Sequence, residues 1–277
     1  MRTDEDTAWE ISVLGVRGAF PVADRNFMEY GGNTSCISVD YGDGILCFDA
    51  GSGLSGLGGR LTEVKRLDIL IGHMHMDHIL GLYGLSALCR PGLEIHLYGE
   101  ARQGISFRKQ LETFLGRPYW PIDLCELPVQ PAVHEIDAGE SFVLRGSGGK
   151  ELRVSTLRGN HPDGSLLYKV ESEKRSVVYT LDCEMNEEMF SALAEFARDS
   201  SLLIWDGNFV REDKRDGWGH STWEEGLRLG RAAGVKSILV THYAKEYSDR
   251  FLRGQERLAA EADRSCRFAR EGMVIRL

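Results

Sequence analysis

Hydrophobic residues recur along the chain with two periods, which separate expected strands from expected helices. Short apolar runs, or alternating apolar and polar residues, predict strands at residues 11–16, 36–40, 45–49, 67–72, 94–98, 152–157, 166–171, 176–181, 202–205, 237–240 and 273–275. Apolar residues spaced three and four apart predict helices at residues 77–89, 101–115, 187–198, 222–233 and 250–260. Strands in both halves of the chain, with helices between them, predict two facing sheets with the helices outside.

Potential metal ligands are concentrated at the end of one of these strands. His73, His75, Asp77 and His78 directly follow the strand expected at residues 67–72. Alternate side chains of an extended segment point the same way, so His73, His75 and Asp77 are expected on one side. Imidazole and carboxylate together suit zinc, manganese or iron, and groups this close could hold two adjacent ions.

Further polar residues follow other expected strands. His161 lies in a turn-rich stretch after residues 152–157, Asp182 follows residues 176–181, and His242 follows residues 237–240. Each one alone has an ordinary explanation as a loop residue, a turn former or a helix cap. Because several strand ends supply metal-type ligands in order, we interpret them as parts of one site. The glycine-rich residues 51–59 lack the Gly-Lys-Ser/Thr of a phosphate loop and are expected to turn into a short helix.

The ordered series HxHxDH, His, Asp, GHST and THY resembles the metallo-β-lactamase superfamily of binuclear hydrolases over nearly the whole chain. The segments YGGNTSC (30–36) and FDAG (48–51) are similar to its phosphodiesterase branch, which includes phosphoribosyl 1,2-cyclic phosphate phosphodiesterases and relatives acting on cyclic nucleotides. The resemblance implies an α/β fold, a four-layer αββα sandwich, with residues 1–277 in a single domain. It also implies two divalent ions, zinc or manganese before iron, one held by His73, His75 and His161, the other by Asp77, His78 and His242, with Asp182 bridging both.

The chain departs from its relatives at two positions near these motifs. Cys183 follows Asp182 where relatives usually have threonine, and we interpret it first as a small core residue, leaving open a contact with the metals. Phe209 stands where the branch often has tyrosine, so no phenol is expected there. The chain has no C-x-x-C pair, so the additional structural zinc of some relatives is not expected.

The expected chemistry is hydrolysis by hydroxide. Metal coordination brings the pKa of a bound water from about 16 to about 7, so hydroxide is available at neutral pH. His220, in the GHST segment, is the candidate acid for the leaving alkoxide, although a turn-fixing role is equally open from the residues alone. Asp77 could also orient the attacking water. Asp49, at a strand tip, is a candidate partner for a metal-bound imidazole, with a turn former as the alternative.

We do not assign four of the aromatic residues to the site. His96 and His134 are assigned to structure, and Trp120 and Trp218, although able to line a pocket, are expected to pack within loops.

The net charge of the chain and the spacing of its motifs limit the size of the expected substrate. The 277 residues carry a net charge of −9, with no lysine-rich arm, which argues against a long nucleic acid and favours a small anionic phosphodiester. His161 and Asp182 are 21 positions apart, too few for the RNA-gripping insertion of transfer-RNA 3′-processing nucleases, the nearest rival in the branch. Hydrolysis of a lactone, thioester or other carbon ester remains an alternative. A binding protein without activity is a further one.

Several features favour a cytoplasmic protein. No run of about 18 apolar residues predicts a membrane span, and the acidic N-terminus lacks the pattern of a secretion signal. Six scattered cysteines fit reduced thiols better than disulfides. We expect no membrane partner, and a homodimer is compatible with the sequence.

Overall fold

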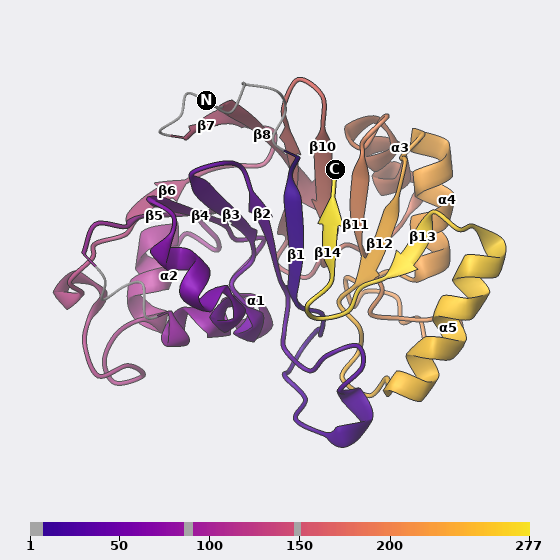
Figure 1. The fold of residues 1–277 in the computed structure, drawn as a ribbon, viewed down its shortest axis with the longest axis horizontal. Coiled ribbons are helices and arrows are strands. Elements are labelled where there is room, and N and C mark those ends of the chain that lie inside the picture. The colour runs from indigo at the N-terminus through magenta and orange to yellow at the C-terminus, as the bar shows by residue number, and fades with distance from the viewer. Residues whose placement is uncertain (1–7, 86–90, 147–150) are drawn as a thin grey trace.

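The computed structural model describes residues 8–85, 91–146 and 151–277. Two sheets face each other, with helices along the outer side of each (Figure 1). The predicted α/β fold, an αββα sandwich, is therefore confirmed. Among the described residues, no helix combines the length and apolar composition needed to cross a membrane.

The first sheet has the strand order β14-β1-β2-β3-β4-β5-β6. Neighbours from β3 to β6 are parallel, and those from β14 to β3 are antiparallel. The strands are β1 (Glu10–Gly15), β2 (Cys36–Asp40), β3 (Gly44–Phe48), β4 (Arg66–Leu70), β5 (Glu94–Gly99), β6 (Ala132–Glu135) and β14 (Val274–Arg276).

Alternation along β3 shows how this sheet separates two cores. Leu46 and Phe48 belong to the core between the sheets, where the Phe48 ring stacks on Tyr179 of the second sheet at 4.8 Å. Ile45 and Cys47 belong to the core on the other face. That face is covered by the 3₁₀ helices η2 (Ser52–Thr62) and η3 (Leu80–Gly84), with α1 (Met76–Ile79) and α2 (Phe107–Phe114). Both faces are apolar because both are covered.

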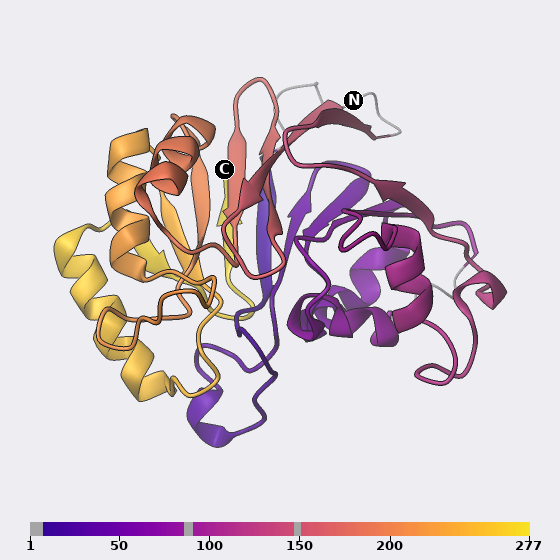
Figure 2. The ribbon, with the colours of Figure 1, turned by 180° about the vertical axis from the view of Figure 1, so that it is seen from behind.

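The second sheet has the strand order β13-β12-β11-β10-β9-β8-β7, with β10 to β13 parallel. The helices α3 (Glu187–Phe196), α4 (Trp223–Ala233) and α5 (Asp249–Ala262) lie along its outer side (Figure 2). The strands are β7 (Ser141–Arg145), β8 (Glu151–Gly159), β9 (Ser165–Glu171), β10 (Ser176–Thr180), β11 (Leu202–Asp206), β12 (Ile238–Thr241) and β13 (Cys266–Phe268).

Local signals set the ends of α4, the helix that follows the GHST segment. The Thr222 hydroxyl accepts from the Glu225 N–H while the Glu225 carboxylate accepts from the Thr222 N–H, a reciprocal capping box. Gly234 ends the helix in the left-handed conformation, with φ of 69°.

Two predicted helices are wrong in extent. The pattern at residues 101–115 forms α2 only from Phe107, because Gln103 and Gly104 turn the chain with φ of 51° and 76° and Ser106 then caps the helix. The pattern at residues 77–89 does not form one helix. α1 ends at Ile79 and gives way to η3, where Gly81 approaches the Gly51 backbone so closely that a Cβ would lie 2.0 Å from its oxygen. The last part of that prediction, residues 86–89, lies outside the described residues.

The pattern also missed β6, β7 and β13. They are short, and β7 is an edge strand in which only Leu144 is buried, so little alternation is visible in the sequence. Residues 51–59, expected to turn into a short helix, themselves form most of the 3₁₀ helix η2 (Ser52–Thr62), which is interrupted at Gly58.

Candidate functional site

The candidate site lies where strands of both sheets end. β3 leads into Asp49, β10 into Asp182 and β12 into His242, and these residues have φ of 57°, 57° and 61°. Positive φ is uncommon for residues other than glycine and is retained mainly where the surrounding structure enforces it, often at active sites. The strand ends of the two sheets are also joined directly, since the Leu166 N–H donates to the Gly72 carbonyl over 2.8 Å.

The Asp182 carboxylate stands between two pairs of histidines. Its Oδ2 atom is 3.5 Å from Nε2 of His73 and 3.5 Å from Nε2 of His161. Its Oδ1 atom is 3.2 Å from Nε2 of His78 and 3.1 Å from Nε2 of His242. Each carboxylate oxygen therefore faces a different pair of imidazoles.

The remaining predicted ligands complete the two groups. Asp77 Oδ2 is 3.3 Å from Nε2 of His78 and 3.3 Å from Nε2 of His242. The His75 ring lies 4.3 Å from the His73 ring, centroid to centroid, and is more exposed than the others. The structure thus brings together every residue predicted to hold metal, and we call this set the histidine–aspartate centre: His73, His75, Asp77, His78, His161, Asp182 and His242.

Unpaired polar atoms show what this centre can hold. Nε2 of His73, Nε2 of His78 and Oδ1 of Asp182 are buried without a hydrogen-bond partner. Leaving such atoms unpaired costs free energy, and acceptor atoms that converge are satisfied together by a cation. The donor atoms lie within 4.8 Å of one another in each of two groups, His73–His75–His161–Asp182 and Asp77–His78–His242. Imidazole and carboxylate donors in this arrangement fit divalent metal ions.

Asp49 contacts the His78 ring at Nδ1, the nitrogen that does not face Asp182. Its Oδ2 atom is 2.6 Å from Nδ1 of His78 and accepts the Tyr179 hydroxyl over 2.6 Å, and its Oδ1 atom accepts the Gly72 N–H over 2.7 Å. The expected contact between Asp49 and an imidazole of the centre is confirmed. The interaction holds the His78 proton on Nδ1 and leaves Nε2 free as a ligand.

Asp206 was not predicted as a site residue. This fully buried carboxylate at the end of β11 places Oδ2 2.9 Å from Nδ1 of His220 and Oδ1 3.4 Å from Nδ1 of His242. It also forms a third group of ligand-type atoms with Asp182, His220 and His242. A signal was present in the sequence, because Asp206 ends a buried parallel strand just as Asp182 follows one.

Burial and charge divide the imidazoles into two kinds. Burial lowers the pKa of His161 to about 4 and that of His73 well below its ordinary value. Burial would also lower the pKa of His242, but Asp182, Asp206 and Asp77 raise it to about 10. The side of the centre around His242 therefore carries negative charge that attracts cations.

The same balance applies to His220. Burial opposes its charge, but Asp206 outweighs burial and raises the pKa of His220 above its ordinary value.

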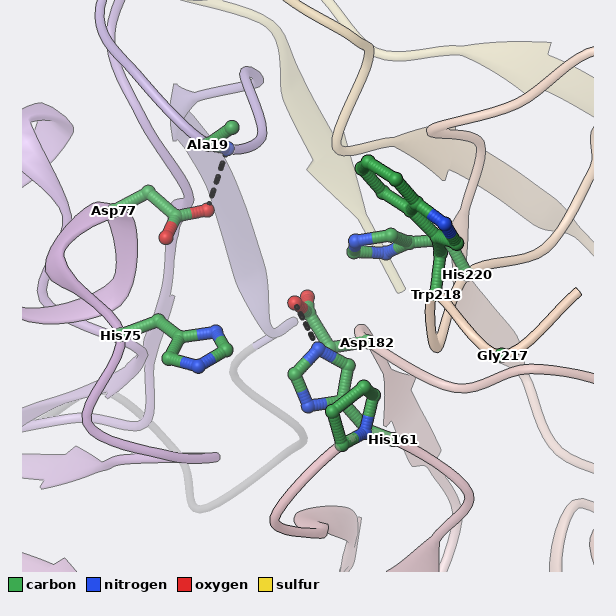
Figure 3. Close-up of a pocket in the computed structure, with 9 residues that line it drawn as sticks. Ala19, His75, Asp77, His161, Asp182, Gly217, Trp218 and His220 are labelled. Carbon is green, nitrogen blue, oxygen red and sulfur yellow. Dashed lines mark hydrogen bonds and ion pairs between the residues drawn. The ribbon is translucent and has the colours of Figure 1, made fainter. Parts of the chain in front are cut away.

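A cavity of about 300 Å³ opens over the centre. His75 and Asp77 lie on one side of it and Trp218 and His220 on the other, with Asp182 and His161 between them (Figure 3). The interpretation of Trp218 as loop packing is therefore wrong, since it lines the cavity and is 56% exposed.

Other aromatic and thiol side chains lie where they were expected. Trp120 packs edge-on against Tyr83, and His96 bonds to His134 over 2.9 Å between β5 and β6. Cys183 is fully buried, which raises the pKa of its thiol to about 12, and it belongs to none of the metal-type groups among the described residues. Phe209 lies edge-on to the His220 ring.

Comparisons with known proteins agree with this geometry. The family model of the β-lactamase superfamily domain matches residues 46–243. The ribonuclease Z of Archaeoglobus fulgidus is 27% identical over 87% of this chain and 89% of its own length.

Solved structures share the fold. The metallo-β-lactamase fold protein YhfI from Bacillus subtilis matches with a TM-score of 0.74 and 20% identity, over 98% of this chain and 100% of that one. A diphosphatase from the PhnP family matches with a TM-score of 0.68 and 16% identity, over 98% of both chains. Because the family model covers more than half of the sequence and the fold agrees, the chain belongs to the metallo-β-lactamase superfamily of hydrolases, whose fold implies divalent metal ions.

Proposed function

We propose that this protein is a binuclear metal-dependent phosphodiesterase that hydrolyses a small phosphodiester, with cyclic phosphodiesters as the first candidates. The proposal is carried by Asp182, whose two oxygens face different histidine pairs beside buried Nε2 atoms that lack a partner. His73, His75 and His161 would hold one ion, Asp77, His78 and His242 the other, and Asp182 both. When bound, such ions supply a hydroxide nucleophile at neutral pH and positive charge for phosphoryl oxygens.

We propose that His220 protonates the leaving group. It lines the cavity across from Asp77 and His75, and Asp206 Oδ2 orients its ring through Nδ1. Nε2 is then the atom that can donate a proton to the departing alkoxide, and Asp206 stabilises the protonated ring. A phosphodiester with an alkyl leaving group needs such a donor.

Asp77 is held on the opposite side. Its Oδ2 atom accepts the Ala19 N–H over 2.7 Å, which fixes the carboxylate at the cavity wall. We propose that Asp77 orients the attacking water as well as holding metal. The two proposed catalytic residues, Asp77 and His220, lie on opposite sides of the cavity and would act on a bound phosphodiester from opposite sides.

Three observations favour a small substrate. The segment between His161 and Asp182 forms only β9, β10 and their turn, so no arm extends from it. The cavity of about 300 Å³ lies at the small end of ligand pockets. The net charge of −9 disfavours a long polyanion.

The relatives favour a second candidate, processing of transfer-RNA 3′ ends. The Archaeoglobus fulgidus relative carries the name ribonuclease Z, and this chain spans 89% of it. Carbon-ester hydrolysis is a third candidate, since the same ions can direct hydroxide to a carbonyl.

Turnover of matched substrates tests these candidates. The metal-replete protein would be assayed with a cyclic nucleotide, a linear dinucleotide, a transfer-RNA precursor and a homoserine lactone, with metal content measured on the same sample. We expect about two ions per chain and the fastest turnover on the cyclic phosphodiester. Precursor RNA cleaved at a comparable rate, or a lactone as the preferred substrate, would overturn the assignment, and a single ion at saturating metal would overturn the binuclear centre.

A further inference from the structure

Trp218 is an exposed aromatic residue inside the catalytic cavity. It lines the cavity with His161, Asp182 and His220, yet 56% of it is accessible to solvent. An indole offers a large rigid apolar face, which is costly to leave in water and useful where a ligand covers it. Neither the metal centre nor the His220–Asp206 pair requires it.

The backbone around Trp218 is held firmly. The Gly217 N–H and the Gly219 N–H donate to the two Glu184 carboxylate oxygens over 3.0 Å and 2.9 Å. Both glycines have positive φ, of 78° and 79°, which a side chain would strain. We call residues 217–220 the Trp218 loop.

Glu184, which accepts both hydrogen bonds from the Trp218 loop, lies close to two of the proposed metal ligands. Glu184 lies two residues after Asp182, and its backbone N–H donates to the Asn160 carbonyl, next to His161. Gly219 packs so closely on His161 that a Cβ would lie 2.2 Å from its ring. The position of the indole is therefore coupled to that of the proposed metal ligands.

One face of the indole is already occupied. The guanidinium carbon of Arg215 lies 4.9 Å from the centre of the Trp218 ring, within the range of a cation–π contact. Arg215 is not among the residues that line the cavity. Arg215 therefore contacts the indole without lining the cavity, and 56% of Trp218 remains accessible to solvent.

We propose that Trp218 determines specificity by stacking on a nucleobase, or a comparable planar ring, carried by the phosphodiester. This inference rests on the proposed function and adds the chemical class of the substrate's side group. The phosphodiester would lie at the histidine–aspartate centre and the ring against the indole, two residues from the proposed acid, His220. A substrate without such a ring would keep its reacting bonds but lose the stacking contact.

The test uses two cyclic esters with identical reacting groups. Adenosine 2′,3′-cyclic phosphate and methyl riboside 2′,3′-cyclic phosphate share the ring strain and the leaving alkoxide and differ only in the base. Base–aromatic stacking measured by alanine substitution corresponds to a factor of about 5 to 150. Trp218→Ala should lower kcat/KM by about that factor for the adenosine ester and leave the methyl riboside ester unchanged.

Matched variants separate stacking from damage to the fold. Trp218→Phe keeps an aromatic face and should restore part of the preference. Tyr119→Ala removes another exposed aromatic side chain, 72% accessible and not among the cavity residues, and should change neither ester. Equal losses on both esters in Trp218→Ala, or no loss on either, would overturn the stacking role while the phosphodiesterase assignment stands.

Binding gives a readout that does not depend on turnover. Calorimetry would measure the binding of adenosine 5′-monophosphate and of methyl phosphate. The Trp218→Ala variant should bind adenosine 5′-monophosphate more weakly than the wild type does, and methyl phosphate equally well. If the wild-type protein cleaves neither ester, the proposed function fails and this measurement still decides the role of Trp218. If Trp218→Ala lowers turnover only on a transfer-RNA precursor, the stacked base belongs to RNA, and the proposal of a small nucleotide substrate is wrong.

Discussion

Asp49→Asn should weaken one metal site while leaving the fold intact. Asn is nearly isosteric with Asp and tolerates the left-handed backbone that Asp49 adopts, with φ of 57°. The substitution changes only what the side chain offers its neighbours. The wild-type carboxylate is buried and accepts hydrogen bonds from Tyr179, Gly72 and His78.

The consequence follows from the direction of each hydrogen bond. The amide oxygen can still accept the Gly72 N–H, which places the amide NH₂ at the position 2.6 Å from His78 Nδ1. The Tyr179 hydroxyl can rotate to accept instead of donating. As a metal ligand His78 is neutral, and its Nδ1 atom can then accept a hydrogen bond only if the proton moves to Nε2, the atom that faces Asp182 and Asp77.

The size of the effect can be bounded. Loss of a partner that orients a metal-bound imidazole typically reduces metal affinity by about 10- to 100-fold, or roughly 1.4 to 2.8 kcal/mol. We expect this loss at the site formed by Asp77, His78 and His242. The site formed by His73, His75 and His161 should change much less.

The assay is a metal titration against a competing chelator that resolves the two sites. Tyr179→Phe is the matched control, because it removes one donor to Asp49 and keeps the carboxylate, so both sites should stay near wild-type affinity. If the Asp49→Asn variant binds both ions as the wild type does, Asp49 does not tune His78 and the reasoning is wrong.

The remaining predictions concern turnover, backbone and pH. His220→Ala should lower turnover on alkyl leaving groups by about a hundredfold or more with metal content near normal, and less on a phenolate leaving group; loss of the metals would contradict its role as an acid. Gly219→Ala should impair metal binding and turnover more than Gly217→Ala, since both have positive φ but only at Gly219 would the new Cβ collide, at 2.2 Å from His161; equal effects in both assays would refute the collision. Burial would raise the pKa of Glu256, but side-chain hydrogen bonds hold it below its ordinary 4.5, so its carboxylate stabilises the fold above that pH and the contribution is lost as pH falls through the lowered pKa. Glu256→Gln should therefore lower Tm near neutral pH and have less effect in acid, and an equal change in Tm at both would contradict this.

The sequence by itself determined the metal-type residues and the strands that deliver them. His73, His75, Asp77 and His78 lie within one short segment, so their proximity is a local property of the chain. The apolar runs before Asp182 and His242 predicted β10 and β12 because buried parallel strands are apolar on both faces. Family resemblance then added the pairing of ligands, which residue spacing alone left open.

Only the tertiary structure decided how these residues face one another. The two-sided contacts of Asp182, the pairing of Asp206 with His220 and the opening of Trp218 into the cavity join segments that are far apart or lie in loops. The start of α2 within residues 101–115 and the break after α1 near Gly81 likewise depended on turns and close backbone contacts. Periodicity reports which face of an element is buried. It does not report which neighbour lies opposite, because sheet pairing and packing between distant segments set that neighbour.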